Sequence, residues 1–458
     1  MADIYDLIVI GGGPGGYLSA RVAAKKGAKV ALFEKDSLGG TCLNVGCIPT
    51  KYLLDKAKLM DRITELTEQG IFKEAGQFSF RKIQQGKEKA VSQLVGGVGS
   101  LLKASGVKLV KGSAQLMPGL RVSCNGREYQ AKDIIIATGS SPVTVPVPGA
   151  ENTIDSTAAL ALQKIPERLV VIGGGVIGME LASAYNAYGS DVTVVEMMER
   201  LYPAEEQKIV DGLVAAMTCK GVKIETGAAV KEVKKDRETL AVRYQKGEEE
   251  ITLPADVVLM AAGRKANLEG IDANRLGIRL NSKGEIVVNQ RMETSVPHIY
   301  AIGDVIGGYQ LAHAAYAEGE CAVHNIMDGP KTADLSVMPR CIYTIPCMAA
   351  VGITSAQARE RGIDASVGTF HYRANGMALV EDAQGMVIVI ADKKTKETLG
   401  VHILGEGATE MISFAAAAVI NKMTLAQWED LIVAHPSLSE MVREAALDCF
   451  GMAVHSGR

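Results

Sequence analysis

The sequence predicts an α/β protein with two similar strand–helix–strand units and a separate α+β unit at its C-terminal end. Three observations lead to this prediction. A glycine-rich turn between a strand and a helix occurs twice, within residues 5–34 and 168–196. Apolar runs in residues 133–140 and 256–264 are typical of strands buried on both faces. From Met338 onward, short strand-like segments lead into helical ones.

The two glycine-rich turns have the same pattern. Leu7–Ile10 precede a turn that runs from Gly11 to Gly16, and Leu169–Ile172 precede one from Gly173 to Gly178. In each copy an acid, Glu34 or Glu196, ends the second strand. Such glycines allow a tight turn, close approach of a pyrophosphate and close packing of helix on strand, while the acid binds a ribose diol. The sequence therefore predicts two Rossmann-like domains that bind two dinucleotides.

Composition excludes several classes of protein. The 458 residues contain 49 Lys and Arg against 52 Asp and Glu, which gives a net charge of −3. A broadly basic nucleic-acid or membrane-surface binder would carry a positive excess. The 49 glycines and only 14 prolines indicate tight turns between regular elements and not disorder.

Sequence features also bear on the compartment. No apolar run reaches the roughly 18 residues that a membrane-spanning helix needs. The N-terminal residues 1–6 lack a basic region and enter a strand at once, which argues against a targeting peptide. We therefore expect a cytoplasmic protein whose eight cysteines are free thiols, metal ligands or a catalytic redox pair.

Two cysteines stand directly after the first dinucleotide-binding pattern. Cys42 and Cys47 belong to the segment Gly39–Lys51, in which Asn44 and Gly46 allow the chain to bring both sulfurs together. A zinc site would need a second Cys/His pair at ligand spacing, and no histidine cluster accompanies Cys341 and Cys347. Two inert buried thiols are the other alternative. A redox-active pair beside a dinucleotide fits the position best.

These motifs resemble the flavoprotein disulfide reductases, and most closely the members that oxidise dihydrolipoamide. The resemblance runs from end to end: both glycine turns, Gly39–Lys51, Ala137–Gly139, Tyr300–Asp304 and His435–Glu440. It implies an FAD-binding domain at 1–143 that continues at 266–337. It also implies an NAD-binding domain at 144–265 and a dimerisation domain at 338–458.

The resemblance implies two cofactors and the residues that contact them. The FAD contacts would be Gly11, Gly13, Pro14, Gly16, Glu34, Lys35, Gly40, Thr41, Lys51, Thr138, Gly139, Asp304 and Ala312. The NAD contacts would be Gly173, Gly175, Ile177, Gly178, Glu196 and Gly263.

The resemblance also implies catalytic roles. Cys47 would face the flavin and Cys42 the substrate, with Lys51 paired to Glu180 beside them. His435 would be the base, oriented by Glu440. Elementary chemistry agrees, because only a thiolate attacks a disulfide and histidine can accept its proton near neutral pH. In this family that histidine serves the other subunit's disulfide, so the active unit would be a homodimer.

Several residues have plainer interpretations. Glu440 completes Ser437-x-x-Glu440, a pattern that also caps helices. Lys51 could be a solvated helix lysine. Arg200 lies four residues after Glu196 and could accommodate the phosphate of NADP, whereas Glu196 favours NAD. The remaining cysteines, apart from Cys341 and Cys347, are expected to be packing residues: Cys124, Cys219, Cys321 and Cys449.

The resemblance implies oxidation of dihydrolipoamide with reduction of NAD. Its partners would be lipoyl domains or a lipoyl carrier protein of a 2-oxoacid dehydrogenase or glycine-cleavage complex. The alternatives are an NADPH-dependent reductase of glutathione, another small disulfide or mercuric ion, an oxidase, or a mainly structural subunit of such a complex. The chain departs from the family pattern at Val433, Ile345 and Cys347, which puts the substrate-channel surface in doubt.

Overall fold

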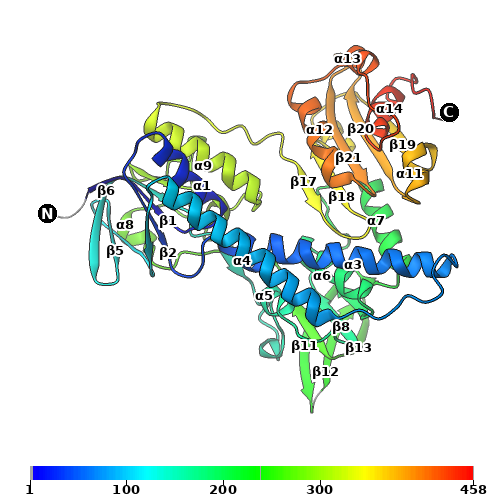
Figure 1. Cartoon of the computed structure of the whole chain (residues 1–458), viewed down its shortest axis with the longest axis horizontal. Coiled ribbons are helices and arrows are strands. Elements are labelled where there is room, and N and C mark those ends of the chain that lie inside the picture. The colour runs from blue at the N-terminus through cyan, green and yellow to red at the C-terminus, as the bar shows by residue number, and fades with distance from the viewer. Residues whose placement is uncertain (1–3, 238, 457–458) are drawn as a thin grey trace.

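The computed structural model describes residues 4–237 and 239–456. Residues 1–3, which carry part of the argument against a targeting peptide, lie outside the described residues. Figure 1 shows one α/β unit with the N-terminal strands, a second below it that ends in a long β-ribbon, and the C-terminal unit at the upper right.

The first glycine turn follows the C-terminal end of a strand in the first sheet. Its order is β3 (Lys108–Lys111), β2 (Val30–Glu34), β1 (Ile4–Ile10), β6 (Arg127–Ile136), β5 (Arg121–Cys124) and β4 (Gln115–Met117), with β16 (Ile299–Ala301) also pairing with β6. The strands β1, β2, β3, β6 and β16 are parallel. Leu7, Val9 and Ile135 are fully buried, as expected for parallel strands covered on both faces. Two of the covering helices, α1 (Pro14–Lys25) and α9 (Ala312–Met327), lie side by side in Figure 1.

The second sheet repeats this arrangement on a smaller scale. Its parallel strands are, in order, β10 (Lys223–Glu225), β9 (Asp191–Val195), β8 (Arg168–Ile172) and β14 (Val257–Met260). The helices are α6 (Val176–Ala187) and α7 (Gln207–Cys219). The charged segment 231–251 belongs to a three-stranded antiparallel sheet of β11 (Ala228–Asp236), β12 (Thr239–Lys246) and β13 (Glu249–Ala255).

The C-terminal unit is an antiparallel sheet covered by helices. The strand order is β17 (Arg340–Ile342), β18 (Met348–Gly352), β21 (Thr398–Leu404), β20 (Met386–Asp392) and β19 (Ala365–His371). The helices are α10 (Ser355–Glu360), α11 (Gly376–Val380), α12 (Ala408–Ile420), α13 (Leu425–Asp430) and α14 (Glu440–Asp448). Val387 and Ile403 of the sheet and Met441 of α14 are buried in one apolar core.

Two long helices connect the first two units. They are α3 (Cys47–Glu68) and α4 (Phe80–Ala104), with a break between them. A short helix, α2 (Gly40–Val45), precedes α3. The remaining elements are β7 (Ser140–Pro142), β15 (Arg264–Ala266), α5 (Ser156–Leu160), α8 (Ala273–Leu276) and the 3₁₀ turns Ala150–Asn152, Gly303–Ile306 and Tyr372–Ala374.

Two kinds of feature are absent from the residues that the structure describes. Within 4–237 and 239–456, no helix is both long and apolar enough to cross a bilayer. The same ranges contain no group of three or more His, Cys, Asp or Glu side chains placed to hold a metal ion.

Candidate active site

The two cysteines of the predicted redox pair lie where α2 meets α3. Cys42 is in α2, and Cys47 is the first residue of α3. Gly46 joins the helices, and a Cβ at this position would lie only 2.8 Å from the carbonyl oxygen of Thr41. Both thiols are free and partly buried. The sequence between them therefore forms a tight junction that brings the two sulfurs together.

The two thiols have unequal acidity. A hydrogen bond from Cys42 lowers the pKa of Cys47 below that of an ordinary thiol; burial opposes this shift, and the charge of Lys51 reinforces it. The same hydrogen bond, together with burial, raises the pKa of Cys42. When the reduced pair loses one proton, the thiolate is therefore on Cys47.

Lys51 lies one helical turn after Cys47 and contacts a buried carboxylate. Its Nζ donates to both carboxylate oxygens of Glu180, at 2.9 and 2.8 Å, and lies 4.5 Å from the ring centre of Tyr343. Glu180 is in α6 and only 3% exposed. It also accepts a hydrogen bond from the backbone N–H of Tyr343, at 3.0 Å. This partly buried ion pair holds α3, α6 and the loop after β17 together beside the thiols.

The first glycine turn leaves room that side chains would fill. Gly11 has φ +106°, and a Cβ there would lie 2.2 Å from the carbonyl oxygen of Ala137. A Cβ at Gly16 would lie 1.8 Å from the carbonyl oxygen of Gly11. The start of α1, capped by Gly13, has no side-chain hydrogen bond on its free amides. Glu34 accepts a hydrogen bond from Gly12 N–H at 2.7 Å. Free amides, a tight turn and a nearby acid fit a dinucleotide.

The second turn has the same construction. Gly173 has φ +108°, and a Cβ at Gly178 would lie 2.1 Å from the carbonyl oxygen of Gly173. The start of α6, capped by Gly175, also has no side-chain hydrogen bond on its amides. Glu196 accepts from the N–H groups of Gly174 at 2.6 Å and Met198 at 2.7 Å. The duplicated sequence pattern thus corresponds to duplicated geometry.

A polar cluster not predicted from the sequence lies around Asp304. Ser140 donates a hydrogen bond to Asp304. Arg264 donates to Ser140 through its Nε at 2.7 Å and to the Ser140 carbonyl oxygen at 2.6 Å. Burial lowers the pKa of Arg264. The signal in the sequence is that Arg264 directly follows Gly263 at a strand end, where side chains of functional sites often gather.

The structure places the other predicted cofactor residues as follows. Thr138 donates to the carbonyl oxygen of Asn267 at 2.6 Å, and Gly139 and Gly263 have φ of +72° and +115°. Lys35 forms an exposed ion pair with Glu269. Thr41 lies within 3.4 Å of Arg264. Pro14, Ile177 and Ala312 are in the first turns of α1, α6 and α9, and Gly40 begins α2.

His435 and Glu440 form a hydrogen-bonded pair on the C-terminal unit. The Nδ1 of His435 lies 2.9 Å from an oxygen of Glu440, and the histidine side chain is 79% exposed. Partial burial alone would raise the pKa of Glu440, but hydrogen bonds from Ser437 N–H and His435 lower it. The carboxylate therefore stays charged and holds the imidazole with its Nε2 outward. In Figure 1, α14 lies far from α1 of the same chain.

The helix-cap interpretation of Glu440 is only partly correct. Ser437 N–H donates to the second carboxylate oxygen of Glu440 at 2.9 Å, as in a capping box. The Ser437 hydroxyl, however, donates to the carbonyl oxygen of Ala434, and α14 begins at Glu440 itself. One carboxylate oxygen holds the turn and the other holds His435.

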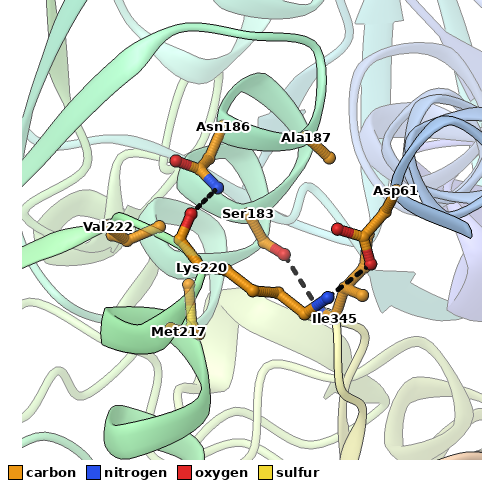
Figure 2. Close-up of a pocket in the computed structure, with 8 residues that line it drawn as sticks. All are labelled: Asp61, Ser183, Asn186, Ala187, Met217, Lys220, Val222 and Ile345. Atoms are coloured by element: carbon orange, nitrogen blue, oxygen red, sulfur yellow. Dashed lines mark hydrogen bonds and ion pairs between the residues drawn. The ribbon is translucent and has the colours of Figure 1, made fainter. Parts of the chain in front are cut away.

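Two of the three positions that depart from the family pattern, Ile345 and Val433, border cavities. Ile345 lines a cavity of about 10 Å³ with Lys220, Asp61 and others (Figure 2). This volume holds at most about one water molecule, so the cavity is no ligand site. Val433 lines an open hollow of about 290 Å³ with mixed apolar and polar walls, together with Phe414, Leu431, Ile432, Ala434, Ser437 and Ser439. Cys347 is partly buried against the core of the C-terminal unit.

The cysteines outside the redox pair mostly pack as expected. Cys124, Cys321 and Cys449 are buried. Cys219 is exposed, so its assignment as a packing residue was wrong. It is the last residue of α7, where the helix ends and its outer face meets solvent.

The chain is similar to known proteins along its whole length. Residues 5–319 match the model of the pyridine nucleotide-disulphide oxidoreductases, and residues 338–446 match the dimerisation domain of that family. A dihydrolipoyl dehydrogenase of Bacillus subtilis is 41% identical over 98% of this chain and 100% of its own length. One from Staphylococcus aureus is 38% identical over 98% of both chains.

Solved structures give the same result. The HOCl-induced flavoprotein disulfide reductase RclA of Escherichia coli, in its Cu(II) complex, superposes with a TM-score of 0.88. It is 29% identical and covers 97% of this chain and 99% of its own.

Proposed function

Because the chain belongs to the pyridine nucleotide-disulphide oxidoreductase family, we propose that it oxidises dihydrolipoamide to lipoamide and reduces NAD to NADH. It is an FAD-dependent oxidoreductase with a dimerisation domain. The observation that carries the proposal is the Cys42–Cys47 pair, set beside the Lys51–Glu180 ion pair and close to a glycine turn that fits a dinucleotide.

The first glycine turn, Glu34 and the Asp304 cluster would hold FAD. When bound, FAD supplies the two-electron link between the cysteine pair and the nicotinamide. The chain's own contribution is electrostatic. Lys51 places a positive charge near Cys47, which favours the thiolate there. Glu180 fixes the position of that charge.

The thiol chemistry follows from the unequal cysteines. Starting from the Cys42–Cys47 disulfide, a substrate thiolate attacks Cys42, and Cys47 leaves as the stabilised thiolate. The second substrate thiol, once deprotonated, attacks the substrate sulfur of the mixed disulfide. Its product is the cyclic disulfide, and Cys42 leaves and takes up a proton. Two electrons have then passed from the dithiol to the cysteine pair.

His435 of the partner subunit would accept the proton of the substrate thiol. Its Nδ1 is held by Glu440, so Nε2 is free to take a proton. The imidazole is exposed on a single chain, which suits a group that completes a site across a dimer interface. The exposed apolar segment before it, with Ile432 95% exposed, suits burial against a second subunit.

The surroundings of Glu196 support NAD over NADP. A 2′-phosphate needs cations, whereas the residues after Glu196 are the exposed Met197 and Met198. Arg200 does not fill this role, because it donates to the carbonyl oxygens of Pro203 and Glu205 within its own loop. Glu196 would repel a phosphate and accept a hydrogen bond from a ribose hydroxyl.

The proposed substrate defines the partners. A lipoyl domain or lipoyl carrier protein of a 2-oxoacid dehydrogenase or glycine-cleavage complex would present the dithiol. A cytoplasmic location remains a prediction from the sequence. The principal alternative is an NADPH-dependent reductase of a small disulfide, in line with the reductase of Escherichia coli that the chain resembles in structure.

Replacement of the substrate-side thiol tests the proposal. Cys42→Ser should lower NAD-linked oxidation of dihydrolipoamide at least about a hundredfold while bound FAD is retained. Val122→Ala, a packing change in β5 at a buried position, is the control for general destabilisation. Full turnover by Cys42→Ser, or no turnover by the unmodified protein with dihydrolipoamide and NAD, would overturn the proposal.

A further inference from the structure

Two cysteines outside the redox pair lie on one face of a hairpin in the C-terminal unit. Cys341 of β17 pairs with Ala349 of β18, and Cys347 precedes Ala349 by two residues. Side chains directly opposite each other, or two apart on one strand, share a face of the sheet. Both cysteines and Ala349 pack in the apolar core shared with α12 and α14, whereas Ile342 and Met348 belong to a different core. The two thiols are therefore diagonal neighbours on one face.

The spacing of this second cysteine pair suits a bridging ion better than a disulfide. Diagonal neighbours across an antiparallel pair have Cα atoms roughly 7–8 Å apart, whereas a disulfide needs at most about 6.8 Å. An ion bound by both sulfurs adds two bonds of about 2.3 Å each, which spans the extra distance.

The number of ligands indicates the kind of ion. Structural zinc takes four ligands in a tetrahedron. Within residues 4–237 and 239–456, no group of three or more His, Cys, Asp or Glu side chains is placed to hold a metal. Two thiolates alone suit a soft cation that accepts two ligands, such as Cu(I).

The surroundings keep both thiols protonated until a cation displaces the protons. Burial raises the pKa of Cys341 to about 11 and that of Cys347 to about 12. Charges of both signs also act on the two thiols: Lys51, Lys58, Arg340, Glu180, Glu406 and Glu410. Because a metal binds the thiolate and not the thiol, binding releases protons and is favoured as the pH rises.

We propose that Cys341 and Cys347 form a binding site for a soft monovalent cation such as Cu(I), separate from the redox pair. Binding forms two sulfur–metal bonds, breaks two S–H bonds and releases two protons to solvent, and no electrons are transferred. Both residues are only partly buried, which leaves the sulfurs within reach of an ion. The site uses neither Cys42 nor Cys47, so it goes beyond the proposed function and does not depend on it.

Retention of Ag(I), a soft monovalent ion that needs no reductant, tests the site. The reference protein is the holoenzyme with Cys42→Ser and Cys47→Ser, in which the redox pair cannot bind the ion. It is loaded with Ag(I) and dialysed against excess N-acetylcysteine, and bound silver is measured by mass spectrometry. A site with two thiolates in one molecule binds about a hundredfold or more tighter than a single thiolate. We expect one retained Ag(I) per chain.

Removal of either thiol should abolish this retention. Added to the reference protein, Cys341→Val and Cys347→Ala should each lower the affinity for Ag(I) at least about a hundredfold. Cys219→Ser, which removes an exposed single thiol at the end of α7, is the matched control and should retain one Ag(I). Retention by both variants, or none by the reference protein, would overturn the inference.

A measurement on the unmodified sequence covers the case in which a variant fails to fold. Holoenzyme with its redox pair oxidised is treated with iodoacetamide, with and without one equivalent of Ag(I), and its peptides are analysed by mass spectrometry. Ag(I) should slow modification of Cys341 and Cys347 together about tenfold and leave Cys219 unchanged. Protection of neither, or a disulfide between Cys341 and Cys347, would contradict the site. None of these outcomes depends on turnover of dihydrolipoamide.

Discussion

The charge next to Cys47 is the residue-scale feature with the clearest consequence. Lys51 helps to lower the pKa of this thiol, so the thiolate forms at a lower pH than in an ordinary cysteine. Lys51→Met should raise that pKa. Alkylation of Cys47 in the reduced protein should therefore shift to higher pH, and turnover near pH 7 should fall about tenfold and partly recover as the pH rises.

This substitution also leaves Glu180 buried without its cation, which would destabilise the protein by about 3 kcal/mol or more. The double variant Lys51→Met/Glu180→Gln removes that effect. It should recover thermal stability. Because the charge of Glu180 raises the pKa of Cys47, although less than Lys51 lowers it, the pH profile should return only part of the way. A profile that returns to that of the unmodified protein would contradict the electrostatic role of Lys51.

A second residue-scale prediction concerns Glu440. One of its oxygens holds His435 and the other holds the turn at Ser437. Glu440→Gln keeps the shape but loses the charge that favours the imidazolium. We expect dihydrolipoamide oxidation to fall about tenfold to a hundredfold. Reduction of ferricyanide by NADH, which bypasses substrate thiol deprotonation, should not change. An equal loss in both reactions would indicate a structural defect.

The sequence predicted site residues best where they lie close together along the chain. Cys42, Cys47 and Lys51 fall within thirteen consecutive positions, and helix periodicity alone places Lys51 one turn from Cys47. The contacts of Tyr343 with Glu180 and of Arg264 with Ser140 join segments more than a hundred residues apart. No local pattern encodes such pairs, which explains why the site residues Tyr343, Ser140 and Arg264 were missed.

At the scale of elements, the junction of α2 and α3 determines how the two sulfurs meet. Gly46→Ala would place a methyl group 2.8 Å from the carbonyl oxygen of Thr41. We expect a loss of about 1–3 kcal/mol in the free energy of unfolding, measured by denaturant titration. Turnover should fall more than stability predicts, because the thiols lose their alignment. Gly376→Ala is the control, since its Cβ would meet no neighbour.

Element boundaries show where sequence patterns were insufficient. The alternating charged residues 231–251 are typical of an exposed hairpin, but β12 pairs on both sides, with β11 and with β13. Alternation identifies exposed strands without giving their number. The Ser437-x-x-Glu440 pattern is typical of a helix that is capped by Ser437, whereas α14 begins at Glu440. The serine hydroxyl there bonds to Ala434 and so does not cap the helix.

At the scale of the whole molecule, the proposal requires a site shared between two subunits. Cys42→Ser and His435→Gln chains should each be nearly inactive alone. After mixing and subunit exchange, each heterodimer would contain one intact site, so roughly a quarter of the activity should return. Activity is measured as NADH formation from dihydrolipoamide. No recovery, with exchange verified by mass spectrometry, would mean that His435 does not act across the interface.

The most direct test of the central claim follows the visible spectrum of the anaerobic holoenzyme. Dihydrolipoamide is added first, and then NAD or NADP in separate samples. We expect prompt reduction of the flavin with a long-wavelength thiolate–flavin band, followed by reoxidation and formation of reduced nicotinamide with NAD only. A protein that ignores dihydrolipoamide but is reduced by NADPH would contradict both the proposed substrate and the role given to Glu196.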